Sequence, residues 1–371
     1  MYLIVGAGIS GSVLANLIAE RLNQKVLIID RREHIAGNCF DYLNANENIT
    51  VHKYGPHIFH TNNKEVWDYL SNFTKWHYFY LKPNVMIEGN RVSLPFTLKT
   101  LRELFSTSMA ERIENKLITK YGYGVKVPIL DFQKSKDKDL NFIGKFVYEN
   151  VFKNYTIKQW GLKPEEIDAS VTARVPIYIS NDSRYFQDKY QAIPIKGYTK
   201  LIENILNHKN ITVQLNTDYK TLSQNEMKEF KAIFYTGAID EYFDYQYGEL
   251  PYRSLKFDIM TIDKEYYQKS VVTNYPNDYD FTRITEHKYF LDEKSNKTMI
   301  SVEYPQAFSL GKNERYYPIN NDKNDKLYNK YLRESKKLNN VYFFGRLGDY
   351  KYYNMDLAVE RVLKLFKEIF K

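Results

Sequence analysis

Residues 2–11 read YLIVGAGISG, an apolar run that ends in three glycines, Gly6, Gly8 and Gly11. The run predicts a short buried strand, and the glycines have the spacing G-x-G-x-x-G. Apolar residues at helical spacing come next, and a second strand, KVLIID, ends at Asp30, 19 residues after Gly11. Together these features predict a βαβ unit that binds a dinucleotide.

Each residue of this motif has a physical task. Gly6 allows a tight turn, Gly8 lets a pyrophosphate approach the backbone, and Gly11 lets the helix pack closely on the strand. Free N–H groups at the start of the helix stabilise the anion. The carboxylate of Asp30 accepts hydrogen bonds from a ribose diol.

The following segments favour FAD over NAD. Asp30 leads into RREHIAGN, whereas an NAD domain usually proceeds directly to another βα unit. Flavoproteins often close the site with a C-terminal segment, and GRLGDYKYYNMDLAV (345–359) has that form, with a helix starting near Met355. The N-terminus of this helix would face the N1–C2=O edge of the flavin, where negative charge accumulates on reduction. An ordinary strand–turn–helix is the alternative.

The composition limits the classes of fold, partner and compartment that are possible for this chain. The chain has 371 residues, 43% of them hydrophobic, enough for two or three globular domains. The net charge of +8 suggests phosphates, but the basic residues are scattered, which favours a nucleotide substrate over nucleic acid. Cys39 is the only cysteine, so no internal disulfide is expected and a reducing cytoplasm fits. No run approaches the ~20 apolar residues of a membrane helix, and none resembles a signal peptide.

The predicted secondary structure changes twice in the middle of the chain. Residues 97–121 and 142–155 have apolar side chains at three- and four-residue steps, typical of amphipathic helices, and 134–141 reads as a charged, solvated connector between them. From 171 onward, short β-branched and aromatic runs, beginning with VTARVPIYIS, predict an antiparallel sheet. Between these runs, GYTKLIENIL reads as a helix, and NITVQLN and AIFYTG read as strands of the nucleotide-binding domain.

We therefore predict an α/β fold with an FAD-binding Rossmann-like domain, an inserted helical domain and an antiparallel β-sheet domain. The predicted boundaries are 1–82, 191–245 and 318–371 for the FAD-binding domain, 97–163 for the helical domain with a mobile loop, and 83–96, 164–190 and 246–317 for the sheet domain that takes the substrate.

Several longer motifs, in order along the chain, resemble those of the bacterial UDP-galactopyranose mutases. The similarity runs from the first strand to the last helix, which makes it far more specific than the glycine motif alone. The motifs that carry it are KYGPHIFHT (53–61), NYTIKQWG (154–161), RYFQDKYQAIP (184–194), KGYTKL (196–201), YRSLKF (252–257), FTRITEHKYF (281–290), VEYP (302–305), YYPIN (316–320) and FGRLGDYKYYNMD (344–356).

The resemblance implies an isomerase, an intramolecular transferase that interconverts UDP-galactopyranose and UDP-galactofuranose with no net redox change. In that family the FAD must be reduced, and its N5 atom forms a covalent adduct with the sugar while UDP leaves and returns. The product, a galactofuranose donor, belongs to cell-surface polysaccharide biosynthesis.

The resemblance also implies roles for individual residues. Arg174 and Arg283 match the arginines that clamp the diphosphate, a task suited to a charged guanidinium fork. Tyr185, Tyr317 and Tyr352 match tyrosines that donate hydroxyls to it without adding charge to a closed site. The alternative for each arginine is an ordinary salt-bridged surface residue. Tyr350 and Tyr353 are expected to pack rather than bind.

Other predicted substrate contacts surround these. Phe152 and Tyr155, three apart on a helix, would sandwich a uracil ring, although two core aromatics are the alternative. Trp160 resembles the tryptophan of the family's mobile lid, which excludes water. The resemblance places His60 near the sugar, and Asn84, Thr156 and Asn274 complete the predicted substrate set.

Arg346 is expected beside the flavin, where it would stabilise the reduced, anionic form. The three-residue spacing of His57 and His60 might suggest a metal, but further nearby ligands are lacking and none is expected. Many family members have aspartate where this chain has Asn354, so Asp356 or a bound water would have to compensate. The remaining predicted cofactor contacts are Ile9, Ser10, Arg31, Gly37, Asn38, His57, Ile58, Val213 and Met355.

Several properties stay open or rest on the resemblance alone. The expected substrate is UDP-galactose, and the sequence leaves open whether UDP-N-acetylgalactosamine is accepted. We expect a cytoplasmic homodimer whose flavin is reduced by a donor such as NAD(P)H. The alternative functions are a flavin-dependent amine oxidase or dehydrogenase on the same cofactor fold, and a nucleotide-sugar binder without a flavin.

Overall fold

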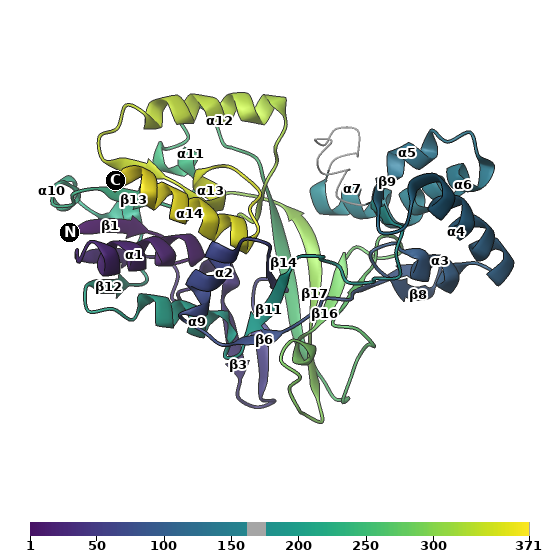
Figure 1. Ribbon diagram of the computed structural model, residues 1–371. Helices are drawn as coiled ribbons and strands as arrows, with labels where there is room; N and C mark the ends of the chain where they lie inside the picture. The colour runs from purple at the N-terminus through teal and green to yellow at the C-terminus, as the bar shows by residue number, and fades with distance from the viewer. Residues whose placement is uncertain (162–175, 371) are drawn as a thin grey trace.

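The computed structural model describes residues 1–161 and 176–370. Its N-terminal strand lies in a five-stranded, all-parallel sheet, at the left of Figure 1. The predicted βαβ unit is confirmed, and segments from the middle and end of the chain complete the sheet. Its strands, in spatial order, are β12 (Ile211–Gln214), β2 (Val26–Ile29), β1 (Tyr2–Val5), β13 (Ile233–Tyr235) and β19 (Val341–Phe343).

One large hydrophobic cluster holds helices against this sheet. Helix α1 (Ile9–Arg21) packs beside α9 (Gly197–Leu206) and α14 (Met355–Ile369). The helix predicted at GYTKLIENIL and the helix start predicted at Met355 are confirmed. The other helices of this part of the chain are α2 (Lys64–Ser71), α10 (Gln224–Lys228), α11 (Ile239–Tyr242), α12 (Asp322–Ser335) and α13 (Gly345–Gly348).

A seven-stranded sheet occupies the centre of Figure 1. The prediction of a purely antiparallel sheet was wrong at one place, because β15 and β7 pair in parallel. The hairpin of β7 and β8 comes from a much earlier part of the chain, so no tight turn dictates its direction next to β15. The strand order is β18 (Tyr317–Pro318), β14 (Tyr252–Ile262), β17 (Thr298–Ala307), β16 (Arg283–Glu286), β15 (Val272–Asn274), β7 (Asn84–Ile87) and β8 (Asn90–Ser93).

A helical region with its own hydrophobic cluster lies at the right of Figure 1. Two predictions were wrong there. The connector predicted at 134–141 becomes helical from Lys138, because the Asp137 carboxylate accepts the N–H groups of Asp139 and Leu140 and so caps the helix. The described end of the strand predicted at 171–180 pairs within this region, with β9 (Lys126–Pro128), and not with the large sheet.

The helical region also contains an irregular turn. A π-helical turn, Tyr148–Lys153, joins α6 to α7, and such turns are frequent at functional sites. The elements here are α3 (Leu98–Leu104), α4 (Thr107–Tyr121), β9 (Lys126–Pro128), α5 (Ile129–Gln133), α6 (Lys138–Val147), α7 (Asn154–Trp160) and β10 (Pro176–Tyr178).

Two small sheets connect these parts. They also bring the histidine-containing segment 52–60 between the parallel sheet and the large sheet. Across the described residues, no helix is both long and apolar enough to cross a membrane. The connecting strands are β3 (Asp41–Asn44) with β4 (Ile49–His52), and β5 (Phe59–Thr61) with β11 (Tyr190–Pro194) and β6 (Trp76–Tyr78).

Candidate active site

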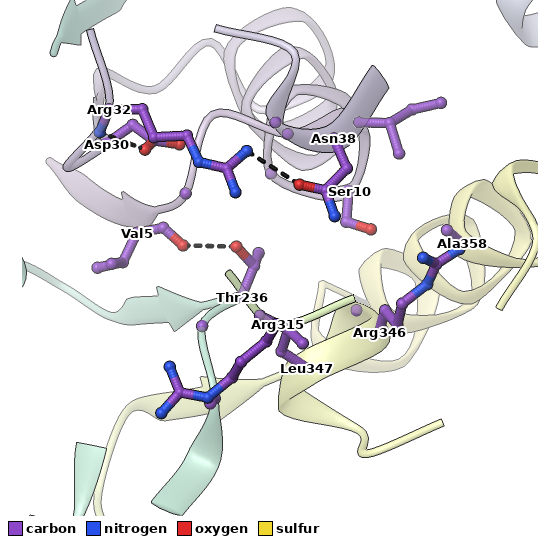
Figure 2. A pocket seen from close by; sticks show the side chains of 18 of the residues that line it. Val5, Ser10, Asp30, Arg32, Asn38, Thr236, Arg315, Arg346, Leu347 and Ala358 are labelled. Carbon is purple, nitrogen blue, oxygen red and sulfur yellow. Dashed lines mark hydrogen bonds between the residues drawn. The ribbon is translucent and has the colours of Figure 1, made fainter. Parts of the chain in front are cut away.

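A pocket opens at the carboxyl ends of β1, β2 and β13, where α1 begins (Figure 2). The glycines of the motif form its floor. A Cβ on Gly11 would lie 1.9 Å from the carbonyl oxygen of Gly6, so α1 can pack here only with glycine. Gly6 has a φ of +106°, which favours glycine. At Gly8 the nearest atom to an added Cβ is 3.8 Å away, so the backbone there is open to a ligand.

Asp30 has a structural task in addition to the predicted one. One of its oxygens accepts the N–H of Ala7 at 2.8 Å, and the other accepts the N–H of Arg32 at 2.9 Å. These bonds hold the glycine turn against the end of β2. Each carboxylate oxygen can accept a further hydrogen bond, so a ribose diol remains compatible with this arrangement.

Most of the predicted cofactor residues meet in this pocket. Ile58, Val213 and Asp356 do not line it, and Val213 lies on the edge strand β12 with 36% of its surface exposed. The predicted residues that do line it are Gly6, Gly8, Ile9, Ser10, Gly11, Asp30, Arg31, Gly37, Asn38, His57, Arg346, Asn354 and Met355.

Several residues that line the pocket come from distant segments and were not predicted from the sequence. Thr236 follows β13, and its hydroxyl donates to the carbonyl of Val5 at 2.8 Å, visible as a dashed line in Figure 2. The predicted strand AIFYTG could have revealed it, because ligands bind at the carboxyl ends of such strands. Glu314 and Arg315 follow the long strand β17 instead, and no local pattern signals their position.

Ion pairs join these distant segments at one end of the pocket. Glu314 accepts from Arg31 at 3.1 Å and from Arg32 at 3.0 Å. Glu241 accepts from Arg31 at 3.3 Å and from the buried Arg315 at 2.8 Å. The glutamates therefore neutralise part of the positive charge that the RREHIAGN extension brings to the pocket.

At the other end, α14 directs its N-terminus at the pocket. Asn354 is the N-cap residue, and within the described chain its side chain makes no capping hydrogen bond. Burial raises the pKa of the nearby Asp356 carboxyl, whose Oδ1 has no hydrogen-bond partner among the described residues. That Asp356 or a bound water compensates for the negative charge that Asn354 lacks thus stays a prediction.

The pocket fits a flavin dinucleotide by these features. It combines an open backbone at Gly8, a helix start at each end and a guanidinium, Arg346, beside the α14 terminus. The Arg346 guanidinium donates to the carbonyls of Tyr316 and Tyr353, which fixes its orientation. When bound, the isoalloxazine would lie next to Arg346 and the α14 N-terminus, both of which favour negative charge.

Two predicted histidines lie in different surroundings. His57 lines the pocket, and burial together with the charge of Arg346 lowers its pKa to about 4, so its imidazole is neutral. His60 lies on β5 outside the lining, with its ring stacked 3.6 Å from that of Phe186. Its Nδ1 pairs with Asp188 at 3.0 Å.

Arg283 lies at the start of β16 and belongs to a buried ion pair. Its Nε donates to Glu303 at 2.6 Å, and the Glu303 side chain is 1% exposed. Burial alone would lower the pKa of Arg283, but Glu303 and the neighbouring Tyr155 and Tyr317 outweigh it, and the pKa is raised. Arg283 therefore stays charged and is held in one orientation. Arg174, the other predicted clamp residue, lies outside the described residues.

An aromatic cluster lies next to Arg283. The rings of Tyr317 and Tyr352 are 5.0 Å apart, and that of Trp160 is 6.3 Å from each. The Arg346 guanidinium lies 5.6 Å from the Tyr317 ring and 5.4 Å from the Tyr352 ring. Arg346 thus belongs both to the cofactor pocket and to the predicted substrate cluster.

The predicted uracil sandwich is only partly assembled. Phe152 is 3% exposed and packs in the helical core, the alternative that the sequence left open. Phe152 lies in the π-helical turn, whereas Tyr155 lies on α7 and interacts with Arg283. Tyr155 is therefore the better placed of the two to stack on a base.

The other predicted substrate residues lie on several elements. The Asn274 amide donates to the carbonyl of Asn84 at 3.2 Å where β15 meets β7. Thr156 is buried on α7, and Tyr185 is 44% exposed. Tyr350, expected to pack, is 1% exposed, and its hydroxyl donates to the carbonyls of Pro251 and Ile319.

Comparison with known proteins gives consistent matches. A family model for UDP-galactopyranose mutase matches residues 150–352, and one for an NAD(P)-binding Rossmann-like domain matches residues 4–73. A probable UDP-galactopyranose mutase of Klebsiella pneumoniae is 39% identical over 369 residues, covering 99% of this chain and 94% of its own length. A dTDP-fucopyranose mutase of Escherichia coli is 37% identical over 368 residues, covering 98% and 96%.

Solved structures agree on the fold. A reduced UDP-galactopyranose mutase superposes with a TM-score of 0.74 at 13% identity, covering 100% of this chain and 93% of that one. A putrescine oxidase superposes with a TM-score of 0.59 at 10% identity, covering 100% and 98%. At these identities both matches show the fold alone, so the amine oxidase alternative shares the architecture but lacks the sequence similarity.

Proposed function

Because this chain belongs to the UDP-galactopyranose mutase family, we propose that it interconverts the pyranose and furanose forms of UDP-galactose on reduced FAD. The observation that carries the proposal is the double position of Arg346. It lines the cofactor pocket and also lies over the rings of Tyr317 and Tyr352, beside Arg283. A sugar diphosphate held by Arg283 and these hydroxyls would therefore lie next to the flavin.

The residues of the chain have separable tasks in this reaction. Arg283 binds diphosphate oxygens, whose charge grows as the bond to the sugar breaks, and Glu303 holds its guanidinium in place. Tyr317 and Tyr352 add neutral hydroxyl donors, and Trp160 beside them keeps water away from the sugar. A reduced flavin, when bound, supplies the nucleophile. Arg174 is proposed to complete the clamp.

The identity of the sugar nucleotide needs a direct test. A dTDP-fucopyranose mutase, at 37% identity, is nearly as similar as one UDP-galactopyranose mutase, at 39%, and more similar than two others, at 34% and 32%. The two substrates differ in the base, in the 2′-hydroxyl of the ribose and in the hydroxyl at C6 of the sugar. We propose UDP-galactose as the preferred substrate on the family model that matches the chain. UDP-N-acetylgalactosamine is a further candidate.

The remaining proposals rest on the family resemblance. They are a cytoplasmic homodimer, a role in cell-surface polysaccharide biosynthesis and an electron donor such as NAD(P)H. We also propose the division into flavin, helical and sheet domains at the boundaries given above. The separate hydrophobic clusters of the parallel sheet and of the helical region support that division.

The test uses the purified protein reduced with dithionite. We expect chromatography to show conversion of UDP-galactopyranose to the furanose, faster than conversion of dTDP-fucopyranose or UDP-N-acetylgalactosamine. Arg283→Ala should lower kcat by ~10²–10³, while the variant before reduction shows the same visible flavin absorbance as the wild type. Arg102→Ala, which removes an arginine paired with Glu114 on the outside of the helical region, is the control and should change little. Near-normal turnover of Arg283→Ala would refute the phosphate clamp.

A further inference from the structure

Three histidines lie in a row between the cofactor pocket and the large sheet, and two of them have no part in the chemistry proposed above. His52 ends β4 and is 1% exposed, and His287 opens the 3₁₀ turn after β16 and is 0% exposed. Neither lines the pocket. His57, which does, lies in the turn that precedes β5.

Hydrogen bonds connect the three residues in one direction. The backbone N–H of His57 donates to Nδ1 of His52 at 3.1 Å, and the backbone N–H of His52 donates to Nδ1 of His287 at 3.3 Å. Nε2 of His287 lies 3.2 Å from the hydroxyl of Ser301 on β17. Because each Nδ1 accepts, His52 and His287 must be neutral with the proton on Nε2.

Aromatic contacts hold the His52 ring in the orientation in which Nδ1 accepts this hydrogen bond. It stacks on Phe290 with centroids 4.4 Å apart and planes 6° apart, and Tyr198 meets it edge-on at 5.8 Å. The Nε2 of His52 has no hydrogen-bond partner in the described parts of the chain. Among the residues that the structure describes, the one hydrogen bond that the His52 side chain makes is therefore the bond to the His57 backbone.

Side chains hold the His57 turn on both sides. While His52 accepts the N–H of His57, the Tyr198 hydroxyl donates to its carbonyl at 3.2 Å. The turn also packs closely on the large sheet, since a Cβ on Gly55 would lie 3.1 Å from the Phe257 ring. The position of the His57 backbone thus depends on these two side chains rather than on regular secondary structure, and the imidazole that it carries interacts with the backbone of Gly55.

The same strand reaches the substrate arginine. Ser301 and Glu303 are two apart on β17, so their side chains lie on one face of it. Glu303 holds Arg283, and Ser301 ends the histidine row. The strand therefore fixes the proposed phosphate clamp and the pocket histidine relative to each other.

We infer that His52 is a positioning residue: its Nδ1, together with the Tyr198 hydroxyl, fixes the His57 turn and so sets the imidazole against the cofactor. This inference rests on the proposed function for what the pocket holds. Because His52 touches neither cofactor nor substrate, its loss should act on the geometry of the pocket. We therefore expect it to lower kcat and alter the flavin more than it changes KM.

Two amide variants separate the acceptor from the bulk of the ring. In His52→Asn the amide oxygen can take the place of Nδ1, whereas in His52→Gln it lies one bond farther out. For His52→Gln we expect ~10-fold faster hydrogen exchange in the peptide 53–61, a shifted midpoint potential of the bound flavin and a kcat ~10-fold lower, with KM within about twofold. His52→Asn should stay near wild type in all three.

Tyr198→Phe tests the same turn from its other side and deletes only a hydroxyl. It should also speed exchange in the peptide 53–61, and it decides the matter if His52→Gln does not fold. Wild-type exchange and potential in both His52→Gln and Tyr198→Phe would overturn the inference. Failure of the wild-type protein to hold a flavin would instead overturn the proposed function, since the exchange comparison needs neither cofactor nor turnover.

Discussion

Gly8 and Gly11 belong to one motif, yet the structure predicts different consequences for alanine at the two positions. At Gly11 the new Cβ would lie 1.9 Å from the Gly6 carbonyl oxygen, about 1.5 Å inside ordinary contact distance. Both atoms belong to packed backbone, so the strain cannot be relieved by a side chain. At Gly8 the nearest atom is 3.8 Å away, and the φ of −75° suits alanine.

Gly11→Ala should therefore destabilise the protein itself. Overpacking of this kind costs ~1–3 kcal/mol, and we expect the upper end, which in a chain of this length corresponds to a fall in Tm of roughly 3–4 °C. Gly8→Ala should leave the Tm of the cofactor-free protein within about 1–2 °C. Its methyl group would instead occupy the space that the pyrophosphate needs, so FAD affinity should fall at least ~30-fold, or about 2 kcal/mol.

Thermal melting of the cofactor-free proteins and titration with FAD followed by flavin fluorescence measure the two effects separately. Unchanged FAD affinity in Gly8→Ala would show that the pyrophosphate does not lie at this turn. Unchanged stability in Gly11→Ala would show that α1 does not pack closely against the Gly6 turn at this position.

Three further predictions concern charge and packing. Glu303→Gln should lower kcat with UDP-galactose ~10-fold or more in steady-state assays, because Arg283 loses its buried counter-charge, and an unchanged kcat would argue against that pairing. Burial lowers the pKa of His287 to about 3, below its unfolded value of ~6.5, so its contribution to stability is complete above about pH 6.5. It should fall by up to ~1.4 kcal/mol per pH unit towards pH 3, and denaturant melts of His287→Asn should have a flatter pH profile. Tyr350→Phe should lose ~1–2 kcal/mol of stability, since its hydroxyl bonds to two carbonyls, with kcat unchanged, and an activity loss at full stability would contradict its packing role.

Local sequence patterns predicted the secondary structure correctly where neighbouring residues alone determine it. The strand, glycine turn and helix at the N-terminus and the helix start at Met355 could be read directly, because apolar periodicity and glycine spacing are properties of neighbouring residues. Tyr350 also packs as expected, although the carbonyls that its hydroxyl contacts belong to Pro251 and Ile319, which are distant in the sequence.

Most of the structural features that the sequence did not predict depend on contacts between distant segments. The parallel contact of β15 with β7 depends on where an earlier hairpin docks, which neither strand encodes alone. The helix in 134–141 was hidden because its charged residues read as a solvated connector, although Asp137 is a good N-cap. Glu314 reaches the cofactor pocket through ion pairs with residues more than 280 positions away, beyond any motif.

Counting furanose molecules per reduced flavin tests whether the protein isomerises UDP-galactose on reduced FAD without consuming its electrons. The protein is reduced once, the excess reductant is removed without air, and UDP-galactopyranose is added with the flavin spectrum recorded throughout. We expect many furanose molecules per flavin while the flavin stays reduced, and no conversion by the oxidised protein. Product limited to one molecule per flavin, oxidation of the flavin in step with product, or equal activity of the oxidised protein would contradict it.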